Sequence, residues 1–164
     1  MNNFEPKIVI FRCIWCVPAG EKIPQMPGLK GHFHPIIVKT ACTGRIDPTF
    51  VLHVFAHGAD GVMVAGCPLG ECHYVSGNFK TRRNMILLRN TLSQFGIEPE
   101  RLGMAWFSAS DTAGFLTVLN SFVDNITRLG PLALFATPAD LPSIKPRSGN
   151  AFVSSAPKAA MRPS

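Results

Sequence analysis

The side chains with the most varied chemistry in this sequence are its five cysteines. Cys13 and Cys16 form a CxxC pair, Cys42 stands alone, and four residues separate Cys67 from Cys72. Thiolates bind zinc and iron–sulfur clusters, and a close pair of thiols can also exchange disulfides. Because an odd number of cysteines has no complete pairing, metal binding or redox chemistry is a better explanation than a disulfide framework.

Each group of cysteines follows a short apolar run that is typical of a buried strand. These runs cover residues 7–13, 35–42 and 61–66, and turn residues separate them from the next segments. If the strands are parallel, their carboxyl ends share one edge of the sheet, which is where open α/β folds bind their ligands. The pattern therefore predicts that all five thiols converge on one crevice.

Strand and helix patterns alternate through the rest of the sequence. A fourth apolar run covers residues 101–107, and helices are predicted at 49–57, 79–95 and 112–129. Asp47 and either Ser110 or Asp111 are suited to begin helices as N-caps. The expected fold is a small doubly wound α/β domain, Rossmann or flavodoxin-like, with a parallel sheet of about four strands and right-handed crossovers.

The two ends of this pattern are less regular. Residues 17–31 contain three prolines and three glycines, so an irregular crossover is predicted there instead of a long helix. We expect residues 1–131 to form the α/β domain and residues 132–164 to form an extended, proline-rich tail. The tail also carries apolar residues such as Phe135, Phe152 and Val153. Contact with a partner protein would explain them, and simple disorder is the alternative.

Composition narrows the range of functions. A chain of 164 residues with 46% hydrophobic residues suits one globular domain. The formal charge of +6 is scattered or lies near the end of the chain, and no nucleic-acid-binding motif accompanies it, so nucleic acid is not the expected partner. No run is long enough to span a bilayer, and the first residues lack a signal-peptide pattern, so a cytoplasmic protein is expected.

Two further groups of residues could bind ligands. Four cations on the predicted helix at 79–95 favour an acidic partner or a negatively charged cofactor edge, or simply form a solvated face. These cations are Lys80, Arg82, Arg83 and Arg89. His53 and His57 have a spacing that can hold a metal. Two packed or solvated histidines are favoured there, because no third ligand is close in the sequence.

Three kinds of site are compatible with the cysteines. A thiol–disulfide enzyme would use Cys13 and Cys16, but it leaves the other three cysteines unexplained. A structural zinc site needs four ligands, which usually come from two paired knuckles. A 2Fe-2S cluster needs four thiolates and would leave one cysteine to spare. Spacing places the cluster only modestly ahead of zinc, and the sequence has neither a GxGxxG nor a GxxxxGK[ST] motif to indicate a nucleotide.

Several longer motifs follow one another over roughly residues 6–131. They are CIWC at 13–16, CTGRIDP at 42–48, GCPLGECHY at 66–74, GN at 77–78, GIEPERL at 96–102 and SAS at 108–110. In this order they resemble the delta subunit of viologen-reducing hydrogenases. Pro68 and Glu71 depart from the family pattern, which often has His and Asp at those positions. All five cysteines are present.

The resemblance implies a function in electron transfer. It implies a small α/β domain that carries a 2Fe-2S cluster but performs no bond-making chemistry of its own. Such a subunit passes electrons between a hydrogenase or formate dehydrogenase and the flavin-containing subunit of heterodisulfide reductase, within electron-bifurcating complexes. The likeness raises the iron–sulfur interpretation above zinc and supplies the expected partners.

For the cluster ligands we predict Cys13, Cys42, Cys67 and Cys72, with Cys16 as the spare thiol or a replacement. Three of these are placed by strand ends, and Gly70 gives the loop before Cys72 the freedom to turn back. Residues expected to surround the ligands and tune the cluster come from the same loops. They are Thr43, Gly44, Arg45, Gly70 and His73.

Overall fold

The computed structural model describes residues 4–16, residue 23 and residues 27–134. Within these residues four strands form one parallel sheet in the order β2-β1-β3-β4. The strands are β1 (Lys7–Cys13), β2 (His34–Thr40), β3 (Gly61–Gly66) and β4 (Leu102–Trp106). The predicted fold class is therefore confirmed, and β1 and β3 occupy the two central positions.

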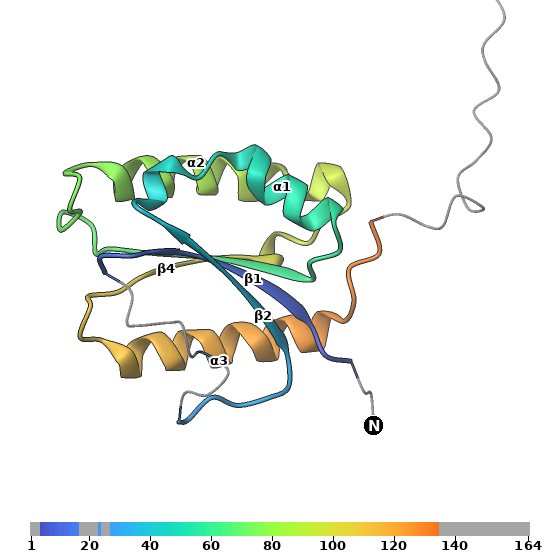
Figure 1. The fold of residues 1–164 in the computed structure, drawn as a ribbon. Helices are drawn as coiled ribbons and strands as arrows, with labels where there is room; N and C mark the ends of the chain where they lie inside the picture. Colours follow the sequence, from blue (N-terminus) through green and yellow to red (C-terminus); the bar gives the residue numbers. More distant parts are fainter. Residues whose placement is uncertain (1–3, 17–22, 24–26, 135–164) are drawn as a thin grey trace, which may run out of the picture. The chain divides into compact units, whose positions relative to one another are not determined.

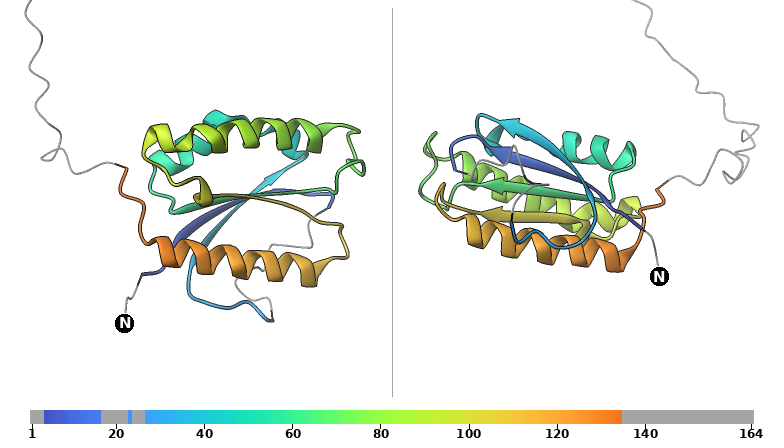
Figure 2. Two further views of the ribbon diagram at one scale, coloured as in Figure 1. Left: turned by 180° about the vertical axis from the view of Figure 1, so that it is seen from behind. Right: turned by 60° about the horizontal axis from the view of Figure 1, so that its bottom comes forward.

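Helices cover both faces of the sheet, as a doubly wound fold requires (Figures 1 and 2). The helices α1 (Pro48–Ala56) and α2 (Gly77–Thr91) lie over one face, and α3 (Thr112–Leu129) lies over the other. Both predicted N-caps are confirmed, since a carboxylate oxygen of Asp47 accepts from Thr49 N at 2.8 Å and one of Asp111 accepts from Gly114 N at 2.9 Å. Caps of this kind satisfy backbone donors that the helix leaves unpaired.

The core has two layers because successive side chains of a strand point to opposite faces. On β1, Val9 and Phe11 pack with α1 and α2, whereas Ile8 and Ile10 pack with α3. All six residues of β3 are buried. Burying an aliphatic side chain contributes roughly 1.5–3 kcal/mol to the stability of the fold. The many buried side chains of the two central strands therefore fix the positions of their carboxyl ends.

The predicted helix at 79–95 is divided differently in the structure. It begins two residues earlier, at Gly77, and its α-helical part ends at Thr91. The hydroxyl of Thr91 donates to Leu88 O at 2.8 Å, a local bond of the kind that bends a helix. A short 3₁₀ segment, η3 (Leu92–Phe95), follows and ends at Gly96, whose φ of 73° is left-handed. Two other 3₁₀ turns are η2 (Thr43–Arg45) and η4 (Pro99–Arg101).

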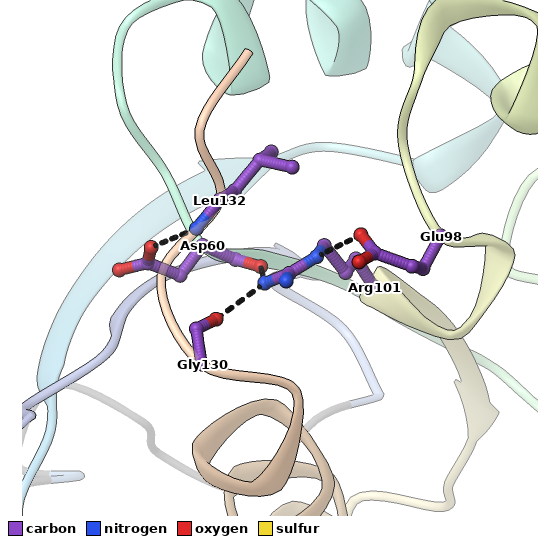
Figure 3. A network of polar contacts seen from close by, with 5 residues as sticks. All are labelled: Asp60, Glu98, Arg101, Gly130 and Leu132. Carbon is purple, nitrogen blue, oxygen red and sulfur yellow. Dashed lines mark hydrogen bonds and ion pairs between the residues drawn. The ribbon is translucent and has the colours of Figure 1, made fainter. Parts of the chain in front are cut away.

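A polar network, which we call the amino-end clasp, joins four segments near the amino ends of the strands. Figure 3 shows its contacts among Asp60, Arg101, Gly130 and Leu132. The carboxylate of Asp60 accepts from Lys7 N at 2.8 Å and from Leu132 N at 3.0 Å. The guanidinium of Arg101, which is 1% exposed, donates to Asp60 O at 3.0 Å and to Gly130 O at 2.9 Å. The clasp therefore fixes the chain just after α3 at the edge opposite to the cysteines.

Parts of the predicted organisation lie outside the described residues. They include most of the irregular crossover, at 17–22 and 24–26, and residues 135–164 of the predicted tail. Leu132 and Leu134, which the sequence pattern assigned to the tail, pack against the core beneath α1 and α2. Over the described part of the chain, no helix combines the length and apolar character needed to cross a membrane.

Candidate metal centre

The structure brings the five thiols together at the carboxyl edge of the sheet. Cys13 is the last residue of β1, Cys67 follows β3 directly, and Cys42 comes two residues after β2. Cys16 and Cys72 reach the same edge from the loops that follow β1 and β3. All five are free thiols, with Cys72 half-buried and the other four buried.

The sulfur atoms form a group of three and a pair. The Sγ atoms of Cys13, Cys16 and Cys67 lie within 4.8 Å of one another, and those of Cys13 and Cys67 are 3.9 Å apart. The Sγ atoms of Cys42 and Cys72 are 3.7 Å apart. The structure thus places Cys16, predicted to be the spare thiol, as near to Cys13 and Cys67 as a ligand would be.

Burial and hydrogen bonding act differently on the individual thiols. Burial raises the pKa of Cys16, Cys42 and Cys67, and neighbouring thiols raise the pKa of Cys16 further. Burial also acts to raise the pKa of Cys72, but backbone amides, first those of Tyr74 and Asn78, outweigh it and lower that pKa. The loop at Cys72 is therefore built to stabilise negative charge on sulfur.

The turn after β2 holds Cys42 in position. Cys42 begins η2, and its Sγ accepts a hydrogen bond from Gly44 N at 3.4 Å. The buried side chain of Thr43 is joined to α2 through Thr81, whose hydroxyl donates to the Thr43 hydroxyl at 3.0 Å. Thr43 and Gly44, both predicted near the ligands, thus anchor this loop, with Gly44 donating directly to the Cys42 sulfur.

The first turn of α2 approaches the sulfur pair more closely than any side chain would allow. A Cβ atom at Gly77 would collide with Sγ of Cys42 and lie 3.2 Å from Sγ of Cys72. A Cβ at Gly44 would in turn lie 2.8 Å from Cα of Gly77. Two glycines facing each other here leave room for the thiols, and the sequence pattern did not predict this role for Gly77.

Asn78 fixes the loop that carries Cys67. Its side chain is 1% exposed, and its amide nitrogen donates to Pro68 O at 2.5 Å and to Cys67 O at 3.4 Å. In the sequence, the Gly77-Asn78 pair stood out only as part of a family motif. A contact between residues ten positions apart in the chain has no local periodicity, so pattern reasoning could not find it.

Aromatic rings lie over the loops at the outer side of the site. The rings of Trp15 and His73 are stacked with centroids 4.0 Å apart, and the ring of Tyr74 stands edge-on to His73 at 5.1 Å. Gly70 has a φ of 92° and allows the turn in which Glu71 N donates to Pro68 O at 2.9 Å. His73 therefore joins the Cys13–Cys16 loop to the Cys67–Cys72 loop.

A cavity of about 450 Å³ opens beside Cys42. Arg45 and Lys80 line it together with Tyr74 and Gly77. Arg45, predicted to influence the cluster, is exposed and lies on the rim of the site. The carboxyl edge of the sheet thus contains buried thiols, and the cavity next to them is lined by positively charged side chains.

The two histidines whose spacing could hold a metal are solvated, as the sequence favoured. The rings of His53 and His57 are 4.0 Å apart at the end of α1, and both residues are exposed. Nδ1 of His57 lies 2.8 Å from His53 O. Among the described residues, the one group of three or more His, Cys, Asp or Glu side chains that converge closely enough to hold a metal is Cys13, Cys16 and Cys67.

Comparison with known proteins agrees with this architecture. The sequence profile of the family described as methyl-viologen-reducing hydrogenase, delta subunit, matches residues 8–130. The chain belongs to this family. Apart from Lys7 at the start of β1, the match covers the strands and α-helices of the described residues and all five cysteines, and it confirms the resemblance inferred from the sequence motifs.

Curated relatives fall into two kinds, and the first kind is about as long as this chain. The iron-sulfur subunit of the vhc F420-non-reducing hydrogenase of Methanococcus voltae is 40% identical over 133 residues, covering 81% of this chain and 92% of the relative. The iron-sulfur subunit of the F420-non-reducing hydrogenase of Archaeoglobus profundus is also 40% identical over 133 residues, covering 79% and 95%.

The second kind is much longer. One example is a subunit of the Ferredoxin/F(420)H(2)-dependent CoB-CoM heterodisulfide reductase of Methanosarcina acetivorans, which we call the long reductase subunit. It is 37% identical over 127 residues, covering 77% of this chain but 16% of the relative. A domain of this family is thus found both as a separate part of hydrogenases and within a larger reductase chain.

Proposed function

We propose that this delta-subunit family chain holds a single 2Fe-2S cluster and relays electrons within a complex of oxidoreductases. The observation that carries the proposal is the arrangement of sulfur atoms in two close pairs, Cys13 with Cys67 and Cys42 with Cys72. Two irons with two protein thiolates each would require this arrangement.

The residues fit such a group in chemistry and in spacing. Two thiolates bound to one tetrahedral metal at roughly 2.3 Å are about 3.8 Å apart, and the two pairs lie at 3.9 and 3.7 Å. The space between Cys42, Cys72 and Gly77 admits no Cβ atom. The proposed ligands remain Cys13, Cys42, Cys67 and Cys72, with Cys16 beside the first pair.

A bound cluster of this type supplies one-electron chemistry, and the chain's own residues set the conditions for it. Gly44 N donates to Cys42, and the backbone amides of Tyr74 and Asn78 stabilise the thiolate of Cys72. Hydrogen bonds to ligand sulfurs and exclusion of water both tune the reduction potential. Burial of Cys13 and Cys67 keeps water from the inner pair.

The proposed electron partners follow from the relatives. Some of these are iron-sulfur subunits of hydrogenases, and others are longer heterodisulfide reductase chains that contain this domain. We therefore propose that the chain relays electrons between a hydrogenase, formate dehydrogenase or similar donor and the flavin subunit of a complex like heterodisulfide reductase, including electron-bifurcating forms.

The test is analysis of the full chain purified without oxygen. Iron and acid-labile sulfide should each be present at about two atoms per chain, and the reduced protein should give the electron paramagnetic resonance signal of a 2Fe-2S centre. One zinc per chain with no sulfide would overturn the proposal and establish the structural zinc site that the sequence also allows.

A further inference from the structure

Large apolar side chains are exposed chiefly around the cysteines. Of the eleven exposed in the described part of the chain, six belong to the loops after β1 and β3 or to the first turn of α2. They are Ile14, Trp15, Leu69, Tyr74, Val75 and Phe79. Single exposed apolar residues need no explanation, but a gathering of them marks an interaction site. We call these six residues the apolar cap.

Within the apolar cap, Val75 combines high exposure with an unfavourable backbone conformation. Its side chain is 81% exposed, and its φ of 68° is left-handed. A β-branched residue is a rare outlier in that region, where glycine or asparagine would be less strained. The fold gains no burial from Val75 that would offset this strain, whereas a partner that covers the side chain would gain its contact area.

A positively charged surface adjoins the apolar cap. Arg45 and Lys80 share the cavity beside Cys42 with Tyr74, and Lys80 and Arg83 share a second cavity, of about 400 Å³, with Phe79. We call Arg45, Lys80 and Arg83 the cationic rim. Asp47 lies near Lys80, but its carboxylate already accepts two hydrogen bonds from Thr49.

The stability of α2 does not account for these cations. The helix has four basic residues and no acidic one, and three of its cations, Lys80, Arg82 and Arg83, lie within its first two turns, with Lys80 in the first. A helix N-terminus carries partial positive charge, so acidic residues stabilise it and basic residues there are unfavourable. Lys80 therefore weakens its own helix, and α2 has no acidic residue to pair with Arg83, so an external negative charge is the better explanation for both.

We propose that the apolar cap and the cationic rim together form the docking surface for an acidic face of the protein that exchanges electrons with this chain. The proposal rests on the proposed function and specifies where its partner binds. An aromatic and apolar centre flanked by charge is the usual composition of a protein interface. The rim has one sign of charge, which selects an acidic partner and speeds its approach.

The deciding experiment measures binding of the full chain to the flavin subunit of the heterodisulfide-reductase-like complex from the same organism, at low and at raised salt. The double substitution Lys80→Glu with Arg83→Glu should weaken binding about tenfold or more at low salt, with a smaller effect at high salt. The matched control is Arg82→Glu with Arg128→Glu. Both control residues are exposed, the net charge changes equally, and binding should change by less than about twofold.

A second variant tests the apolar cap without disturbing its fold. Asparagine tolerates a left-handed backbone, so Val75→Asn should leave thermal stability unchanged or slightly higher. It should nevertheless weaken binding roughly tenfold, because a buried valine contact is lost.

Three results would overturn the docking surface. The first is that the rim variant and the control variant bind the partner equally well. The second is that the wild-type chain does not bind the partner. The third is that the rim variant still binds the protein partner but has lost affinity for a single-stranded RNA used as a competing ligand. Metal and sulfide analysis of the same samples reports on the cluster separately. If the chain holds a cluster but the rim substitutions do not change binding, only the docking surface is contradicted. If the chain holds no cluster but still binds the partner through the rim, only the proposed function is contradicted.

Discussion

At the residue scale, the five thiols differ in what fixes their positions, which is the end of a strand for some and a loop for others. Cys13 and Cys67 are fixed by the two central strands, while Cys16 and Cys72 depend on turns. The Sγ of Cys72 lies 3.7 Å from that of Cys42 and accepts hydrogen bonds from backbone amides. Cys16, in contrast, would add a third sulfur to the pair that Cys13 and Cys67 already form. We therefore propose Cys72, and not Cys16, as the fourth ligand.

Serine substitutions test the ligand set directly. Cys72→Ser should abolish the 2Fe-2S signal, or shift its spectrum strongly if serine oxygen replaces the sulfur. Cys16→Ser should retain iron, sulfide and the electron paramagnetic resonance signal at the wild-type level. Loss of the cluster in Cys16→Ser together with its retention in Cys72→Ser would reverse the assignment.

Gly77 provides a second residue-scale prediction. Gly77→Ala should greatly reduce cluster content, because the added Cβ would occupy the position of the Cys42 sulfur. The matched control is Ser76→Ala, since Ser76 makes no side-chain capping bond to α2. Iron per chain measures the effect, and circular dichroism should show that both variants fold. Equal iron in the two variants would mean that Gly77 does not shape the site.

The sequence alone predicted the gathering of cysteines and both helix caps, because each follows from a local pattern. Strand ends set the positions of Cys13, Cys42 and Cys67, and Asp47 and Asp111 precede their helices directly. The roles of Gly77 and Asn78 were missed. Both depend on contacts with loops far away in the sequence, and no short-range periodicity reflects such contacts.

At the scale of elements, the three α-helices of the described chain were predictable, and α3 has its predicted ends, whereas α2 does not. The amphipathic pattern of residues 79–95 indicates a helix throughout, yet α2 ends at Thr91 and η3 completes the segment. The start at Gly77 depends on its packing against the cysteine loops. Helix ends are set by such tertiary contacts and by single hydrogen bonds, which contribute little to a hydrophobic pattern.

The amino-end clasp gives an element-scale prediction about stability. Arg101→Met should lower the free energy of unfolding by about 3 kcal/mol, because the buried carbonyl oxygen of Asp60 and the half-buried one of Gly130 lose their donor. Denaturant titration measures this loss, and the exposed Arg82→Met serves as the control with little expected change. Cluster spectra should not change, since the clasp lies at the opposite edge of the sheet. A spectral shift in Arg101→Met would indicate that the two edges are coupled.

At the scale of the whole molecule, the described domain uses its two sheet edges differently. The carboxyl edge holds the thiols, the apolar cap and the cationic rim, while the amino edge is closed by hydrogen bonds around Asp60 and Arg101. The last described residues pack there, with Leu132 and Leu134 against the core. The packing of the described residues therefore continues to Leu134, whereas composition places the expected boundary at residue 131.

This boundary determines how the predicted tail should be tested. A chain ending at Leu134 keeps the bond from Leu132 N to Asp60 and the packing of both leucines, so it should fold and hold its cluster like the full chain. A chain ending at Pro131 loses these contacts and should be less stable by about 2 kcal/mol or more.

If the apolar residues of the tail contact a partner, the chain ending at Leu134 should also co-purify less of the flavin subunit of the heterodisulfide-reductase-like complex from the same organism. Ordering a segment on a partner costs entropy that only a sizeable contact surface offsets. Equal co-purification by this chain and the full chain would show that residues 135–164 contribute nothing to assembly, and would leave the docking surface at the carboxyl edge to account for it.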